Sequence, residues 1–111
     1  MELPKGLYVL KDRKPIPCTD PVRWAEELRN IDRRKVDNTE KDDIRVSTVF
    51  LGADLNAAFS GRDPVLFETR VFGGPLDGAT ARYLTWEKAE VGHKDMCEQV
   101  FGKEVITNDT K

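Results

Sequence analysis

The chain has 111 residues, of which 39% are hydrophobic and 34% charged, and its formal net charge is −2. This length fits one domain, and the high charge content indicates a strongly solvated surface around a single core. Because lysines and arginines are interspersed with acidic residues, the basic stripe typical of nucleic-acid or anionic-membrane binding is missing, and we expect neither partner.

The first predicted elements are two short strands. Residues 6–10 (GLYVL) are rich in residues that favour β structure. Residues 15–18 (PIPC) follow a polar turn and are expected to run back at the edge of a sheet. Pro15 and Pro17 require the edge position because proline donates no ladder hydrogen bond.

A first amphipathic helix is predicted to begin at Pro21 and to end near Asn30. Asp20 suits the N-cap position, and proline suits the first helical turn, where its missing N–H costs nothing. Apolar residues recur there at helical spacing, at Trp24, Leu28 and Ile31. This spacing predicts one face that packs against the rest of the domain.

The middle of the chain holds the two strongest strand patterns. Residues 34–43 are very polar and fit either an exposed edge strand over 35–40 or a loop. Residues 44–51 (IRVSTVFL) and 65–72 (VLFETRVF) are rich in β-branched and aromatic residues. Because both faces of these segments are partly apolar, we expect an antiparallel pair of central strands, joined by the long connection 52–64.

The last third of the chain predicts a short strand over 81–84 and a second helix. Thr85 is the expected N-cap, Gly102 the expected stop, and 104–111 a frayed tail. The apolar stripe of this helix comprises Trp86, Ala89, His93, Met96 or Cys97, and Val100. Together the elements predict an α+β fold: a three- to five-stranded, mainly antiparallel sheet with two amphipathic helices packed on one face.

Three segments of the chain resemble a family of small uncharacterised proteins of bacteriophages and prophages. They are residues 46–52 (VSTVFLG), residues 66–74 (LFET and VFGG around Arg70), and residues 82–87 (RYLTWE) with Gly92-His93. The family has no assigned activity. The resemblance implies a phage setting, in which small proteins bind and disable host machinery or bind small signalling molecules. Family members carry Leu-Asp-His after the first glycine, whereas this chain has Ala53-Asp54-Leu55, which argues against catalysis or metal binding in that loop.

The histidine and the cysteines predict structural roles. His93 is the single histidine and lies on the apolar stripe, where a buried ring bonded to a backbone group is expected rather than a general base. Cys97 lies near the end of its helix, where the helix dipole opposes a thiolate. With Cys18 it is expected to be a buried, reduced thiol of a cytoplasmic protein. One histidine and two distant cysteines do not match a zinc site. We expect no catalytic residue, no metal and no cofactor.

The loop 53–63 is the first candidate binding site. A connection of this length is uncommon in a compact domain unless it binds something or is disordered. Asp54, Asn56 and Arg62 offer charges and hydrogen bonds, and Phe59 either folds back as a plug or anchors a partner.

A second candidate site lies on the predicted strands. Glu68 and Arg70 share one strand face, and Arg45 on the neighbouring strand is a candidate to supply one partner charge. This face is either a solvated surface with a cross-strand pair or a polar binding face.

Two functions fit these residues. The first is a non-enzymatic protein that inhibits or sequesters a host component through the loop. The alternative is a pocket for a small anionic, nucleotide-like ligand that uses Arg45, Arg62, Arg70 and Tyr83. The expected partner is thus a host protein or a small signalling molecule, and a homodimer is left open.

Overall fold

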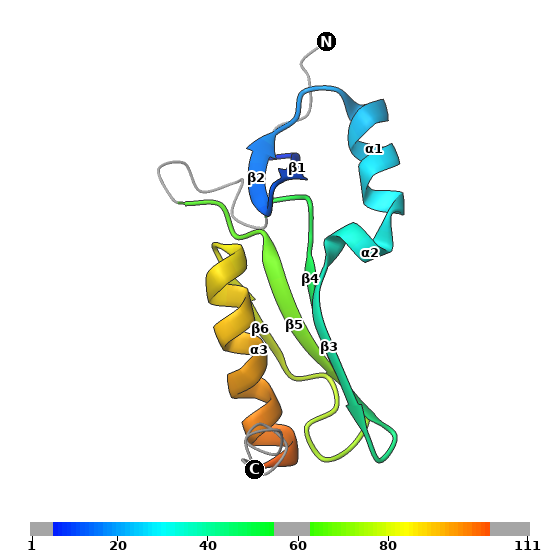
Figure 1. The fold of residues 1–111 in the computed structure, drawn as a ribbon, viewed down its shortest axis with the longest axis vertical. Coiled ribbons are helices and arrows are strands. Elements are labelled where there is room, and N and C mark those ends of the chain that lie inside the picture. Colours follow the sequence, from blue (N-terminus) through cyan, green and yellow to red (C-terminus); the bar gives the residue numbers. More distant parts are fainter. Residues whose placement is uncertain (1–5, 55–62, 103–111) are drawn as a thin grey trace.

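The computed structural model of the protein describes residues 6–54 and 63–102 (Figure 1). Four strands form one antiparallel sheet in the order β3-β4-β5-β6, and β1 pairs with β2 in a separate hairpin. The described elements are β1 (Tyr8–Lys11), β2 (Lys14–Pro17), α1 (Pro21–Arg29), α2 (Ile31–Arg34), β3 (Lys35–Lys41), β4 (Ile44–Phe50), β5 (Phe67–Phe72), β6 (Thr80–Tyr83) and α3 (Trp86–Phe101). The expected α+β fold with an antiparallel sheet and packed helices is confirmed. No helix in this part of the chain is long and apolar enough to cross a membrane.

The predicted strands at the centre of the sheet are confirmed. β4 pairs with β5 from Arg45 opposite Phe72 to Phe50 opposite Phe67. The polar segment that was compatible with a strand or a loop is β3, an edge strand paired with β4 from Lys35 to Lys41. The predicted tail 104–111 lies outside the described residues.

Two tight turns close the hairpins β1–β2 and β3–β4. The pairs Lys11–Lys14 and Lys41–Ile44 each enclose two turn residues. These are Asp12 and Arg13 (φ 51° and 68°) and Asp42 and Asp43 (φ 52° and 66°). Positive φ at both central residues is the geometry of a type I′ turn, which favours Asn-Gly. Both turns therefore hold side chains in a conformation that glycine adopts at lower cost.

Helix α1 begins at Pro21 and ends beside Asn30, as predicted. The carboxylate of Asp20 accepts hydrogen bonds from the backbone of Val22 and Arg23, which caps the first turn. The prediction that Ile31 extends the buried stripe is wrong, since Ile31 begins α2 and is 63% exposed. The cause is Asn30, which ends α1 and whose side chain accepts from the N–H of Arg33, so the chain turns there.

The two longer helices cover different parts of the molecule. α3 contacts all four strands of the sheet, whereas α1 packs beside β1 and the end of β4. The Trp24 indole N–H donates to the carbonyl of Gly52 at 2.8 Å. Leu28 packs so closely on Gly52 that a Cβ there would come within 2.5 Å of it. In Figure 1, α1, α2 and the β1–β2 hairpin form one end of the molecule and α3 lies along the sheet beyond them.

The core beneath α3 is built in three layers. Near the start of α3, Phe50 and Phe67 pack with Trp86 and Ala89. Near its end, an apolar cluster is formed by Val46, Val71, Met96 and Cys97. Between the two lies a polar layer of Thr48, Thr69 and His93, all at most 1% exposed. The alternation of β4 and β5 places these residues on the face that α3 covers.

Candidate functional site

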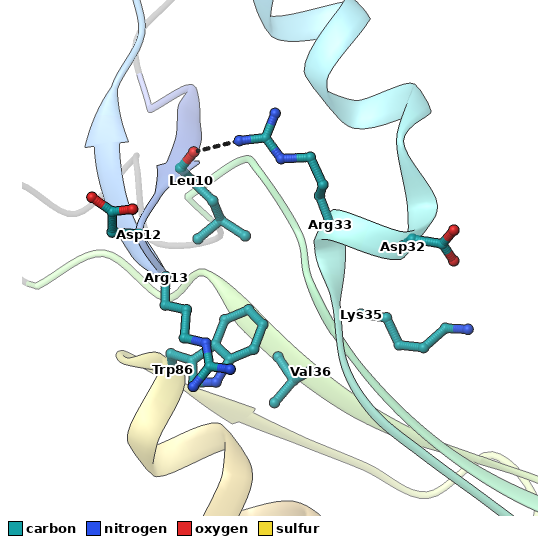
Figure 2. A pocket seen from close by; sticks show the side chains of 8 residues that line it. All are labelled: Leu10, Asp12, Arg13, Asp32, Arg33, Lys35, Val36 and Trp86. Carbon is teal, nitrogen blue, oxygen red and sulfur yellow. Dashed lines mark hydrogen bonds between the residues drawn. The ribbon is translucent and has the colours of Figure 1, made fainter.

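A hollow of about 380 Å³ opens where the β1–β2 turn, the start of β3 and the first residue of α3 meet (Figure 2). Its volume is within the range of pockets that hold small ligands. We call it the Arg13–Trp86 pocket. Its lining residues are Leu10, Asp12, Arg13, Asp32, Arg33, Lys35, Val36 and Trp86. They bring three cations, two carboxylates and an apolar floor to one place.

Trp86 is the buried wall of this pocket. The residue is 8% exposed, and its ring packs edge-on against Phe67 at a centroid distance of 6.2 Å. Its indole N–H is buried and has no hydrogen-bond partner, the only such side-chain atom among the described residues. A buried donor without an acceptor costs about 1–3 kcal/mol, so native proteins seldom retain one.

Arg13 lies across that indole. Its guanidinium carbon is 5.2 Å from the centroid of the Trp86 ring, and Figure 2 shows the side chain reaching down from the β1–β2 turn onto it. No carboxylate within the described ranges pairs with Arg13. Two donors, a guanidinium and an indole N–H, therefore lie close together without an acceptor. An oxyanion is the group that both donors bind well.

Of the other two cations of the pocket, Arg33 has partners within the protein and Lys35 has none among the described residues. Arg33 is bonded to Glu27 at 2.9 Å and reaches the carbonyl of Leu10 at 3.5 Å, the dashed line in Figure 2. Lys35 has no ion-pair partner among the described residues. Two cations, Arg13 and Lys35, are thus available to a ligand. The first turn of α3 adds the positive end of its helix dipole, partly offset by Glu87.

The strand residues predicted from the sequence lie elsewhere. Arg45, Glu68 and Arg70 share the face of the sheet opposite α3, as their register requires. A cross-strand charge pair is present on this face as predicted, but Arg45 is not the residue that supplies the positive charge. Arg45 faces Phe72 in the register and stacks on its ring at 4.4 Å. Glu68 instead pairs with Arg82 at 3.1 Å and more loosely with Arg70 at 3.9 Å.

Tyr83 lies on the other face of the sheet, apart from those three residues. It pairs with Phe67 in the register and packs directly on Gly92 of α3, where any Cβ would overlap the tyrosine ring. Burial is the main cause that raises the pKa of Tyr83, against a hydrogen bond with Thr69 that lowers it. Through its contact with Gly92, the Tyr83 side chain packs α3 against β6.

Within the loop candidate, only the two ends are described. Asp54 accepts a hydrogen bond from the N–H of Val65 at 3.0 Å, which joins the end of one strand segment to the start of the next. Its own N–H donates to the carbonyl of Gly6. Asn56, Phe59 and Arg62 lie outside the described residues. The loop thus begins and ends on a fixed frame.

His93 is buried in a chain of hydroxyl groups. Its Nε2 lies 2.9 Å from the hydroxyl of Thr39 and its Nδ1 lies 2.7 Å from that of Thr48, which in turn bonds to Thr69. The predicted backbone partner is therefore wrong, because threonine side chains from β3 and β4 meet the ring. Burial lowers the pKa of His93, while the carboxylate of Asp37 at 3.8 Å opposes that shift.

The cysteines do not present a nucleophile. Cys18 and Cys97 are both buried and are not bonded to each other. Burial is also the main cause that raises the pKa of the Cys97 thiol, so it stays protonated near neutral pH.

Comparison of the chain with models of known families, with curated proteins and with solved structures found no match. The resemblance to phage and prophage proteins therefore stays a prediction.

The Arg13–Trp86 pocket is absent from the sequence-based predictions. Its two key residues are 73 positions apart in a chain of 111 residues. Sequence pattern places Trp86 on an apolar stripe and Arg13 in a polar turn, with nothing to connect them. The one local signal is a bulky residue, Arg13, at a turn position that favours glycine.

Proposed function

We propose that this protein is a non-enzymatic binding protein that takes a small anionic ligand in the Arg13–Trp86 pocket. The observation that carries the proposal is the buried indole N–H of Trp86, which lacks an acceptor beside an unpaired guanidinium. An oxyanion in the pocket accepts a hydrogen bond from the Trp86 indole N–H. Arg13 shifts away from the ring and binds the same anion. Lys35 adds a second charge, and Leu10 and Val36 offer apolar contact.

This proposal keeps the ligand class of the sequence-based alternative but moves the site. The sequence predicts a nucleotide-like anion at Arg45, Arg62, Arg70 and Tyr83. In the structure, Arg45 is stacked on Phe72 and Tyr83 lies on the opposite face of the sheet. By contrast, the Arg13–Trp86 pocket combines unused donors with a hollow of suitable size.

Sequestration of a host protein through loop 53–63, in a phage setting, stays a second hypothesis. The hydrogen bond between Asp54 and Val65 supports this hypothesis, because it fixes the two ends of the loop and binding loops are usually held by a rigid scaffold.

The test is an NMR titration that follows the two indole N–H signals. Adenosine monophosphate, inorganic phosphate and citrate serve as probes. Binding of an anion at the pocket is expected to move the Trp86 indole proton strongly downfield as it gains an acceptor. The Trp24 indole signal should stay in place because that N–H already donates to Gly52. The protein thus contains its own reference signal, since it has two tryptophans.

Matched variants separate the pocket from general effects on the fold. Arg13→Gly relaxes the turn but removes the guanidinium, and it should weaken binding by about tenfold or more. Asp43→Gly makes the same backbone change in the β3–β4 turn and should bind like the wild type. Trp86→Phe should also weaken binding while leaving the fold intact, because the donor it removes has no partner. If none of the three probes moves the Trp86 signal at millimolar concentration, the proposal is wrong.

A further inference from the structure

β3 is an edge strand whose outer side is uncovered by any described element. It is seven residues long, and five of these residues are exposed. In Figure 1 it forms one border of the sheet, with β4 on its inner side only. Because a strand edge carries unpaired N–H and C=O groups, it is a template for pairing with another strand.

The turn geometry determines which backbone groups point outward. Lys41 and Ile44 close a two-residue turn and so exchange hydrogen bonds across the hairpin. Hydrogen-bonded and non-bonded pairs alternate along an antiparallel ladder, so Thr39 also directs its N–H and C=O toward β4. Asn38 and Glu40 then direct theirs outward. In agreement, the N–H of Asn38 donates to the side chain of its neighbour Asp37 rather than across the ladder.

This pattern limits the ways in which two copies of β3 can pair antiparallel. Outward groups must face outward groups, so the register can change only in steps of two residues. Centred on Thr39, the pairing places Asn38 opposite Glu40 of the second copy and Asp37 opposite Lys41 of the second copy. By symmetry the opposite-charge pair occurs twice.

The neighbouring registers lack opposite-charge pairs or bring like charges together. Centred on Asn38, the pairing would place Asp37 opposite Thr39 and Asn38 opposite its own copy, with no pair of opposite charges. Centred on Glu40, it would place that glutamate opposite its own copy, and centred on Asp37 it would do the same for the aspartate. Directly opposed like charges destabilise a sheet, whereas opposite charges stabilise it. Within the regular span 37–41, the edge is therefore complementary to itself in one register. The register centred on Val36 would also pair opposite charges, Lys35 with Asp37, but it is disrupted by the register shift between these two residues.

We propose that two copies of this chain associate through their β3 edges, in the register centred on Thr39, to form a continuous eight-stranded sheet. The twofold axis is perpendicular to the sheet, so the two α3 helices lie on the same face. The paired span is residues 37–41, because the ladder with β4 shifts register between Lys35 and Asp37. Asp37 can reach the contact because its side chain is 51% exposed, and on pairing its carboxylate releases the Asn38 N–H to the second copy. The interface is small and polar, so the association is weak and depends on concentration.

The experiment is sedimentation equilibrium of the full chain from about 10 µM to about 1 mM. The wild type is expected to move from the monomer mass of 12.6 kDa toward twice that mass. In a dimer of the Asp37→Lys variant, the new lysine would lie opposite Lys41 of the second copy. In a dimer of the Lys41→Asp variant, the new aspartate would lie opposite Asp37 of the second copy. Each variant alone should remain monomeric at concentrations where the wild type dimerises.

Mixing the two variants gives the decisive measurement. In a mixed pair, the lysine introduced at position 37 of one chain meets the aspartate introduced at position 41 of the other. At the second contact, the unchanged Lys41 of the first chain meets the unchanged Asp37 of the second, so both contacts have opposite charges. The mixture should therefore dimerise although neither variant does so alone. Lys88→Asp on α3 is the control for a change of net charge and should dimerise like the wild type.

The proposal does not depend on the ligand pocket, and the two can fail separately. A wild type that stays monomeric to about 1 mM would show that the edge charges only prevent strand pairing. Variants that dimerise alone, or a mixture that stays monomeric, would exclude this register. Circular dichroism of each variant distinguishes lost association from lost folding.

Discussion

The two tryptophans differ in whether the indole N–H has a partner, and they illustrate how single residues divide between structure and function. Trp24 donates to Gly52 and thereby fixes α1 against the end of β4. Trp86 packs deeper than Trp24, yet its N–H is unpartnered among the described residues. A ring needed only for packing would be served by phenylalanine without the cost of an orphaned donor. The retained indole therefore supports a ligand rather than a purely structural role.

Acid should weaken the fold through His93. Burial holds the folded-state pKa of this ring below its unfolded value of about 6.5. As the pH falls below about 6.5, His93 of the unfolded chain takes up a proton, whereas His93 of the folded chain does so only at lower pH. The free energy of unfolding therefore declines. The slope from one such group is at most about 1.4 kcal/mol per pH unit.

Urea denaturation between about pH 7.5 and pH 5 measures this effect. His93→Gln retains a donor and an acceptor for the threonine hydroxyls but has no titratable ring, so its stability should fall less over the same range. An equal decline in the wild type and the variant would assign the acid sensitivity to other groups.

At the scale of elements, local sequence rules predicted most of the fold. The caps Asp20, Thr85 and Gly102 marked helix ends because their chemistry is local. Strands β4 and β5 were predictable because β-branched and aromatic residues fill both. β3 was ambiguous, since its residues are polar and its strand state depends on pairing with β4.

The candidate site was much less predictable than the elements. The pocket depends on how the β1–β2 hairpin packs over the start of α3, and no periodicity within either element encodes that contact. The partners of His93 show the same limit: Thr39 and Thr48 lie 54 and 45 positions away in the chain. Gly92 shows this limit too, because the close approach of Tyr83 from another strand is what requires a glycine there.

Asp43→Gly is expected to stabilise the β3–β4 hairpin. Asp43 has a φ of 66° in a turn position that strongly favours glycine, so the substitution relieves backbone strain. The gain should be about 0.5–1 kcal/mol, reduced by the greater freedom of glycine in the unfolded chain. Thermal unfolding should show a higher midpoint than the wild type. Asp12→Ala, which keeps a side chain at positive φ, is the contrasting variant and should bring no gain.

The whole molecule combines a well-packed sheet with a less supported end. The sheet and α3 enclose the layered core, in which Val46, Phe50, Phe67 and Val71 are at most 1% exposed. The β1–β2 hairpin contributes one buried side chain, Val9, and a two-stranded hairpin is marginal by itself. The Arg13–Trp86 pocket spans the boundary between these two parts, so a ligand in it would tie the hairpin to the start of α3.

Amide hydrogen exchange should therefore show two levels of protection. The amides of β4 and β5 are expected to exchange slowest, because both strands are central and their inward side chains are buried. Those of β1 and β2 should exchange faster by about two orders of magnitude, through local opening of the hairpin. Its hydrogen bonds to the rest of the protein, such as the one from the Tyr8 N–H to the Gly52 carbonyl, can break without exposing the core.

Adenosine monophosphate in the pocket should slow exchange in the hairpin, because the ligand must dissociate before the hairpin opens. Equal protection of the hairpin and the central strands without ligand would show that the molecule opens as one cooperative unit, contrary to this expectation.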